Sequence, residues 1–181
     1  MSSGIETITL GGGCFWCTEA VFARLKGVTS AFPGYSGGKI PNPSYEQVST
    51  GKTGHVEVTQ ITYDPSVITF RQILEIFFAT HDPTALNRQG ADVGTQYRSV
   101  IFYNTEEQRM DAETYIRELT EKKTFNNPIV TKVEPFRAFY PAEEYHQKYY
   151  ERNRDAAYSQ YVITPKVEKL TKKFHDKLKL S

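Results

Sequence analysis

The feature that most restricts the possible folds is a short strand-like segment that runs into three glycines and a pair of cysteines. Residues 5–10 alternate between apolar and polar side chains, which is typical of a β-strand. Glycines occupy residues 11–13, and residues 14–26 then show the apolar spacing of a helix. We therefore expect a strand, a glycine turn and a helix, with Cys14 and Cys17 in the first helical turn.

The rest of the chain continues as an alternation of strand and helix patterns. Period-two alternation predicts further strands at residues 28–35 (interrupted at Pro33 and Gly34), 55–63, 99–103 and 129–135. Helical spacing predicts four more helices: from Thr69 to Thr80, from Thr105 to Lys123, from Pro141 to Arg152, and from Pro165 onward. The order of these segments predicts an α+β fold, a two-layer α/β sandwich of ferredoxin-like type with appended helices.

Length and composition favour a single domain spanning residues 1–181, because no repeat, low-complexity tract or linker divides the chain. With 22 basic and 21 acidic residues, the chain gives no reason to expect binding to nucleic acid or to a membrane. The lysines of residues 166–179 have the spacing of the solvent-facing side of a terminal helix. No targeting signal and no long apolar run are visible, so we expect a cytoplasmic monomer.

Both cysteines and the single tryptophan of the chain lie in one tetrapeptide, residues 14–17, and four interpretations are open. A zinc site needs two more ligands, which only a distant pair among the four scattered histidines would supply. A thioredoxin-like exchanger would use this position, although Phe15 and Trp16 would restrict its access. In a reductive thiol site, one thiolate attacks a small oxidised substrate and the other resolves the product. Two buried cysteines acting as small hydrophobes are the structural alternative.

The start of a helix is expected to lower the pKa of Cys14, because backbone N–H groups and the helix dipole favour a thiolate. Cys17 lies three residues further on and therefore on the same helix face, with Cβ atoms ~5–6 Å apart. A disulfide prefers ~3.8 Å between these atoms, so a bridge would require the first turn to open.

Six blocks of sequence resemble the methionine sulfoxide reductase type A family. Gly-Gly-Gly-Cys-Phe-Trp at residues 11–16 is similar to the signature of that family. Five other blocks match in order: Gly-Tyr-Ser-Gly-Gly (34–38), Pro-Ser-Tyr-Glu-Gln-Val (43–48), Gly-His-Val-Glu-Val (54–58), Gly-Thr-Gln-Tyr-Arg-Ser (94–99) and Ala-Glu-Glu-Tyr-His-Gln (142–147). Any one block arises easily by chance, but the ordered set spans most of the chain and is highly specific.

The resemblance implies a peptide-methionine (S)-S-oxide reductase that acts on methionine sulfoxide, free or in proteins, with no metal and no organic cofactor. Cys14 would attack the sulfoxide sulfur and become a sulfenic acid. Glu57 would protonate the sulfoxide oxygen, which requires burial to hold its pKa well above the usual ~4.3. The hydroxyls of Tyr45 and Tyr97 would help to hold that oxygen.

The resemblance also implies a substrate pocket and a way of recycling the enzyme. Phe15 and Trp16 would form an apolar pocket for the S-methyl group, and Asp92 and His146 match family positions near the substrate. Many family members carry glycine in place of Cys17 and have a resolving cysteine near the C-terminus. Since this chain has no third cysteine, the resemblance implies a Cys14–Cys17 disulfide, which a thioredoxin-like reductant would reopen.

Overall fold

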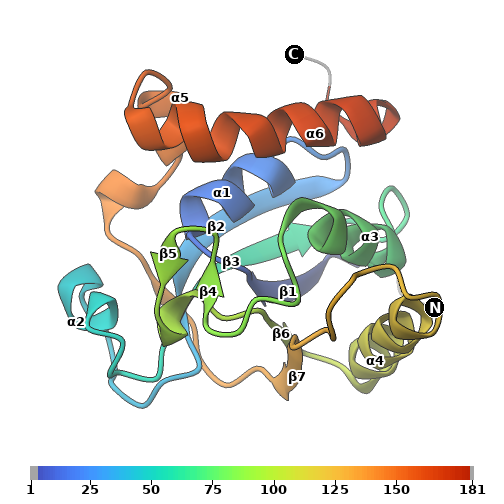
Figure 1. Ribbon diagram of the computed structural model, residues 1–181, viewed down its shortest axis with the longest axis horizontal. Coiled ribbons are helices and arrows are strands. Elements are labelled where there is room, and N and C mark those ends of the chain that lie inside the picture. Colours follow the sequence, from blue (N-terminus) through green and yellow to red (C-terminus); the bar gives the residue numbers. More distant parts are fainter. Residues whose placement is uncertain (1–3, 180–181) are drawn as a thin grey trace.

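A computed structural model describes residues 4–179 and has a mixed α/β architecture, with helices packed on a central sheet (Figure 1). Six strands form this sheet in the spatial order β7-β6-β1-β3-β2-β8. Their bounds are β1 (Glu6–Gly11), β2 (Val28–Ser36), β3 (Val56–Tyr63), β6 (Val100–Tyr103), β7 (Lys132–Pro135) and β8 (Tyr140–Pro141). The strands pair antiparallel except β6 and β7, which run parallel. The predicted strands are therefore present, and β8 is an addition to them.

Strands β2 and β3 form the longest pairing in the sheet, and this pairing continues through the interruption predicted at Pro33 and Gly34. Pro33 lies inside β2 opposite Thr59, and Tyr35 lies opposite Glu57. The expected break is wrong because β2 is close to a sheet edge at this point: its other neighbour, β8, pairs only with Gly34 and Tyr35. A proline is tolerated where one side of the strand needs no ladder hydrogen bond.

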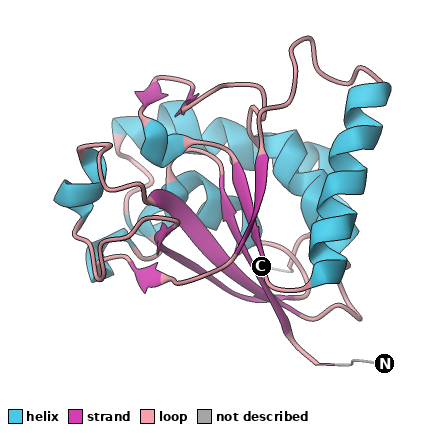
Figure 2. Ribbon diagram, turned by 90° about the horizontal axis from the view of Figure 1, so that it is seen from below, coloured by secondary structure: helices cyan, strands magenta, loops and turns pink. Residues whose placement is uncertain are grey.

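The α-helices are α1 (Phe15–Phe22), α2 (Tyr45–Ser49), α3 (Phe70–Thr80), α4 (Glu106–Glu121), α5 (Tyr149–Arg152) and α6 (Thr164–Phe174). Helices α1, α3 and α4 pack on one face of the sheet, and α6 lies along the outer side of α1 (Figures 1 and 2). The predicted starts of two helices are capped by side chains: those of Thr69 and Thr105 accept hydrogen bonds from the backbone N–H groups of Gln72 and Gln108. Within residues 4–179, no helix is long and apolar enough to cross a membrane.

Two segments differ from the predicted secondary structure. The helix expected from Pro141 onward begins only at Tyr149, because Pro141 pairs in β8 and Lys148 adopts a left-handed backbone conformation (φ 55°). Helix α2 was not predicted, although its capping box is visible in the sequence: Ser44 and Gln47 cap each other's backbone N–H groups. Residues 81–96, between two predicted elements, contain the short strands β4 (Arg88–Gln89) and β5 (Asp92–Val93) and the start of a 3₁₀ turn (Thr95–Tyr97).

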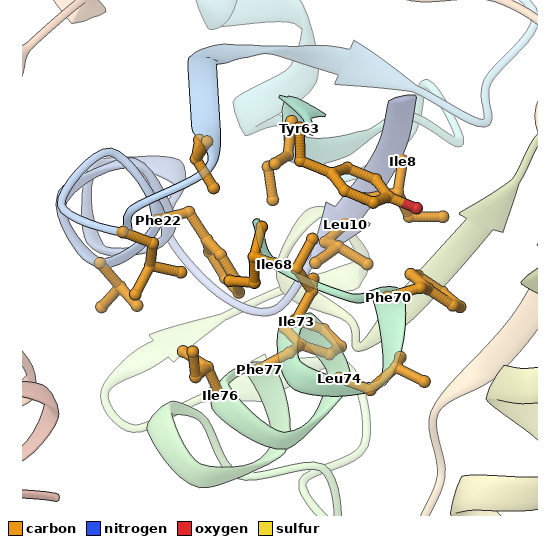
Figure 3. Packing of buried hydrophobic residues seen from close by; sticks show 14 of the residues in the cluster. Ile8, Leu10, Phe22, Tyr63, Ile68, Phe70, Ile73, Leu74, Ile76 and Phe77 are labelled. Carbon is orange, nitrogen blue, oxygen red and sulfur yellow. The ribbon is translucent and has the colours of Figure 1, made fainter. Parts of the chain in front are cut away.

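The main core lies between the sheet and its helices (Figure 3). Ile8 and Leu10 of β1 pack there with Ile73 and Phe77 of α3 and with Phe22 of α1, and all are at most 1 % exposed. A smaller apolar cluster on the opposite face of the sheet consists of Val56, Val58, Val100 and Phe102, with Phe136 and Phe139 packed against it.

Strand β3 therefore sends alternate side chains to different faces. Val56 and Val58 belong to the smaller cluster, while Ile61 and Tyr63 belong to the main core. The period of two puts Glu57 on the helix-covered face with Ile61 and Tyr63. A carboxyl group in that position is buried beside the start of α1.

We predict that Ile73→Ala lowers the free energy of unfolding by about 2–5 kcal/mol, because it leaves a cavity in the main core. Ile73 is fully buried on the inner face of α3. Urea unfolding followed by circular dichroism measures the change. Met110→Ala on α4 is the matched control, since Met110 is 57 % exposed and surface changes cost within about 0.5 kcal/mol. Equal losses in the two variants would contradict the assignment of the core.

Candidate active site

The glycine turn after β1 places both cysteines at the start of α1. Gly13 has φ +94°, a conformation that favours glycine, and Cys14 caps the helix with an extended backbone (φ −65°, ψ 131°). The backbone N–H of Cys17 donates to the carbonyl of Cys14 at 3.1 Å, which closes the first turn. Both cysteines are free thiols and almost fully buried, at 8 % and 2 % exposed. The predicted strand, glycine turn and helix are present, but α1 ends at Phe22 and not near residue 26 as the apolar spacing predicted.

Glu57 is buried directly against the first residue of this helix. Its Oε1 accepts a hydrogen bond from the backbone N–H of Phe15 at 3.2 Å, and the residue is 1 % exposed. Burial raises the pKa of Glu57 to about 8, and the charge of Asp92 adds to that effect, while the Phe15 N–H opposes it. The carboxyl group is therefore largely protonated at neutral pH, as the resemblance requires.

Cys14 does not have the low pKa expected at a helix start. Burial raises its pKa well above the usual value, and the nearby Glu57 and Cys17 raise it further. The backbone N–H of Trp16 and the hydroxyl of Tyr158 act in the opposite direction without outweighing burial. The prediction of a stable thiolate was wrong because it counted the helix dipole but not the loss of solvent.

An aromatic cluster surrounds the two cysteines. The indole N–H of Trp16 donates to Nδ1 of His146 at 3.0 Å, and the Trp16 ring stacks on Tyr149 with centroids 3.6 Å apart. Phe15 lies deeper, 1 % exposed, with its ring 5.0 Å from that of His146. Because Nδ1 of His146 accepts this hydrogen bond, Nε2 carries the ring hydrogen, and this buried atom has no partner among the described residues.

Tyr45 and Tyr97 reach this cluster from two different segments. Tyr45 is the first residue of α2, and its ring lies 4.5 Å from that of His146. Tyr97 ends the 3₁₀ turn that follows β5. Burial, with the charges of Glu57 and Cys14, raises the pKa of Tyr45 to about 12 and also raises that of Tyr97. Both phenols therefore keep their protons and remain hydrogen-bond donors at neutral pH.

Tyr158 belongs to the same cluster, although no matched block contains it. Its hydroxyl donates to Oδ2 of Asp92 at 2.5 Å and lies 4.0 Å from the sulfur of Cys17. Its ring also meets Trp16 edge to face, with centroids 5.6 Å apart. One of twelve tyrosines in a weakly patterned segment gives no signal in the sequence.

Glu19 is a second residue that the sequence analysis missed. Its side chain on α1 is buried, and its Oε2 accepts the backbone N–H of Lys148 at 2.9 Å. The backbone N–H of Tyr149 also bonds to this carboxyl group, whose pKa burial raises to about 7. A charged residue directly before the apolar pair Ala20 and Val21 was the available signal. Glu19 thus fixes the segment that carries the ring stacked on Trp16.

The described part of the chain, residues 4–179, contains no group of three or more His, Cys, Asp or Glu side chains arranged to hold a metal ion. What the structure does bring together is a pair of thiols, a buried protonated acid and a set of aromatic rings. Such a site is characteristic of enzymes that use cysteine for oxidation and reduction.

Comparison with known proteins identifies the family. The model of the peptide methionine sulfoxide reductase family matches residues 6–178. The peptide methionine sulfoxide reductase MsrA of Sulfolobus acidocaldarius is 60 % identical over 173 residues, which cover 96 % of this chain and 97 % of that protein. This chain belongs to the peptide methionine sulfoxide reductase family, and it is an enzyme of that activity.

Solved structures agree with this assignment. The crystal structure of Mxr1 from Saccharomyces cerevisiae in reduced form has a TM-score of 0.78 at 37 % identity, covering 86 % of this chain and 90 % of that one. Mxr1 in complex with Trx2 has a TM-score of 0.56 at 27 % identity, covering 82 % and 87 % of the two chains.

We predict that Glu19→Ala loosens the stack of Tyr149 on Trp16, because the backbone N–H groups of Lys148 and Tyr149 lose their acceptor. Trp16 is the single tryptophan, so its emission should shift to longer wavelength and its quenching by acrylamide should increase. Glu19→Gln keeps one acceptor oxygen and should change less. Glu144→Ala, at an exposed ion pair with Arg152, is the control. Unchanged emission in Glu19→Ala would refute this role.

Proposed function

We propose that Cys14 is the nucleophile of this methionine sulfoxide reductase and that Glu57 is its acid. The observation that carries the proposal is the burial of both groups at one helix start, with the carboxyl of Glu57 held by the Phe15 N–H and largely protonated at neutral pH. A sulfoxide sulfur is a poor electrophile until its oxygen is protonated or strongly hydrogen-bonded. A neutral carboxylic acid beside a thiol supplies that proton.

In the proposed first half-reaction, the sulfur of Cys14 attacks the sulfoxide sulfur while Glu57 protonates the oxygen. The oxygen then passes to Cys14 as a hydroxyl group, which leaves a sulfenic acid and the methionine thioether. The thiol proton of Cys14 replaces the proton that Glu57 gave, so thiol and sulfoxide become sulfenic acid and sulfide. Because burial disfavours a resting thiolate, we propose that Cys14 loses its proton only as the sulfoxide oxygen gains one.

The surrounding side chains take the remaining roles. We propose that the phenols of Tyr45 and Tyr97 donate hydrogen bonds to the sulfoxide oxygen, which their retained protons support. The rings of Phe15 and Trp16 would receive the S-methyl group. The two remaining residues would orient the substrate site, His146 through the Trp16 indole and Asp92 through Tyr158.

The preference for the (S) epimer, in free methionine sulfoxide or in proteins, follows from the type A family and remains a proposal for this chain.

We propose that Cys17 resolves the sulfenic acid by forming a disulfide with Cys14, and that a thioredoxin-like protein reopens it. Cys17 lies one turn from Cys14 on the same helix, and no third cysteine is present in the chain. The structure of Mxr1 in complex with Trx2 supports a reductant of this kind. The bridge requires the Cys17 N–H to Cys14 carbonyl bond to give way, since a disulfide needs a shorter Cβ separation than a helical turn provides.

We further propose that residues 1–181 form one domain around a ferredoxin-like unit, extended by β7 and β8. The strand order β6-β1-β3-β2, all antiparallel, with helices α1 and α3 in the connections β1–β2 and β3–β6, supports this description. Two free thiols suit the reducing cytoplasm, where we place the enzyme as a monomer acting without metal or organic cofactor.

We predict that the rate of the first turnover falls as pH rises above about 8, because Glu57 loses its proton there and no longer donates to the sulfoxide oxygen. Rapid-quench measurement of methionine formed per enzyme, between pH 6 and 10, tests this. Glu57→Gln should lower the rate by about 10²–10⁴-fold and abolish that limb of the profile. Iodoacetamide should still alkylate Cys14 in this variant, which checks that the site is folded. A near-normal rate in Glu57→Gln would remove its role as the acid.

We predict that Cys17→Ser forms about one equivalent of methionine from excess sulfoxide and then stalls with thioredoxin, because the Cys14 sulfenic acid has no thiol to resolve it. Turnover with dithiothreitol should persist, since a small dithiol reduces the sulfenic acid directly. Counting methionine per enzyme with each reductant is the measurement. Thioredoxin-driven turnover at the parent rate would exclude the disulfide pathway.

A further inference from the structure

Cys17 borders a small cavity that neither Cys14 nor Glu57 lines. The walls of this cavity come from the end of β1, from α1, from the end of α3 and from α6. Its lining residues are Gly12, Cys17, Thr18, Val21, Phe22, Phe77, Thr80, His81 and Lys166. The two thiols of one helical turn therefore have different surroundings: Cys14 is close to Glu57, and Cys17 lines a cavity together with Lys166.

Lys166 is the one side chain in this lining that carries a positive charge at neutral pH. The other basic residue there, His81, has its pKa lowered to about 4 by burial, and its ring nitrogens are engaged by the Phe77 carbonyl and the Ser99 hydroxyl. The remaining lining residues are apolar or uncharged. Lys166 is half-buried, so the sequence-based expectation that the lysines of the last helix all face solvent is wrong at this position.

The shape of the last helix explains why Lys166 turns inward. A π-helical turn, Ser159–Ile163, precedes α6, and such a turn accommodates one extra residue. Seven residues make about two turns of a regular α-helix, so positions seven apart lie on the same face. The extra residue of one π-turn increases this spacing to eight. Tyr158 and Lys166 are eight residues apart, and both reach Cys17: Tyr158 with its hydroxyl at 4.0 Å, and Lys166 across the cavity.

The same lysine also borders the outside of the molecule. Thr80, His81 and Lys166 line both the cavity and a surface groove of about 420 Å³, whose wall also includes Lys169. Figure 1 shows α6 lying along α1 on the side away from the sheet. Lys166 therefore lies between Cys17 and solvent, while Lys169, one turn further on, lines the outer groove and not the cavity.

We propose that Lys166 assists the resolving step of catalysis by stabilising Cys17 as a thiolate. This inference rests on the proposed function, in which Cys17 attacks the Cys14 sulfenic acid. The Cys17 sulfur supplies the electron pair of the new S–S bond, and the S–O bond of Cys14 breaks. The hydroxide that leaves takes up the proton lost by Cys17 and departs as water. Lys166 keeps its own proton throughout.

The charges around Cys17 show why a cation is needed. Burial raises the pKa of Cys17, and the carboxyl groups of Asp92 and Glu57 raise it further. Lys166 is the largest influence in the opposite direction, followed by the hydroxyl of Tyr158. Without the ammonium group, a buried thiol near the carboxyl group of Asp92 would ionise too rarely to attack quickly.

The test compares Lys166→Met with Lys166→Arg and with Lys169→Met. In a Cys14→Ser background, the rate of iodoacetamide alkylation of Cys17 against pH measures its ionisation. We expect the midpoint of the pH dependence of Cys17 alkylation to move to higher pH in Lys166→Met. In Lys166→Arg and in Lys169→Met, this midpoint should stay close to that of the protein with both lysines. In enzyme with both cysteines, Lys166→Met should slow disulfide formation at pH 7 about tenfold per active site, with active sites counted as the first equivalent of methionine.

An unmoved midpoint in Lys166→Met, or an equal shift in Lys169→Met, would overturn the inference. Failure of the proposed function gives a different result: Cys17→Ser would then turn over normally with thioredoxin, whatever the alkylation profiles show. Unaltered Trp16 fluorescence in the lysine variants confirms that the site is folded.

Discussion

The hydrogen bond from the Phe15 backbone N–H to Glu57 is the contact on which the site depends. It joins the first residue of α1 to the inner face of β3, and therefore fixes the helix start against the sheet. The N–H groups of a first helical turn lack partners within the helix, so a buried carboxyl group at this position satisfies one of them. The same burial raises the pKa of Glu57 to about 8, which supports its proposed role as the proton donor.

This constraint explains the local sequence. The chain passes from β1 to α1 within a few residues, which only a glycine turn permits: a Cβ on Gly12 would lie 2.9 Å from the ring of His81, and Gly13 has a positive φ. The turn holds Cys14 as the capping residue, close to the carboxyl group of Glu57. The helix start thus places the thiol, while burial and the neighbouring Glu57 and Cys17 raise its pKa more than the backbone N–H of Trp16 lowers it.

The sequence predicted the parts of this site that depend on local pattern. Alternation in β3 and the glycine turn before α1 are both visible without a structure, and the family blocks pointed to Glu57, Tyr45 and Tyr97. Burial was not visible: an alternating strand does not say which face a helix covers, so the pKa values of Cys14 and Glu57 depend on tertiary packing. The predicted helix start at Pro141 was wrong because a proline is common both at a helix start and in an edge strand. Pro141 pairs with Gly34 and therefore belongs to a strand.

The C-terminal segment shows most clearly what local pattern leaves out. Tyr158 and Lys166 lie outside every matched block, and the spacing of the lysines of residues 166–179 suggested a solvent-facing helix. A single π-turn between them changes the register, and α6 then lies on α1 with both side chains toward Cys17. The first turn of α1 is therefore enclosed by β3 on one side and by the C-terminal helix on the other. Glu57 raises the pKa of Cys14 and Lys166 lowers that of Cys17, and in the mechanism proposed above this asymmetry separates attack on the substrate from resolution of the product.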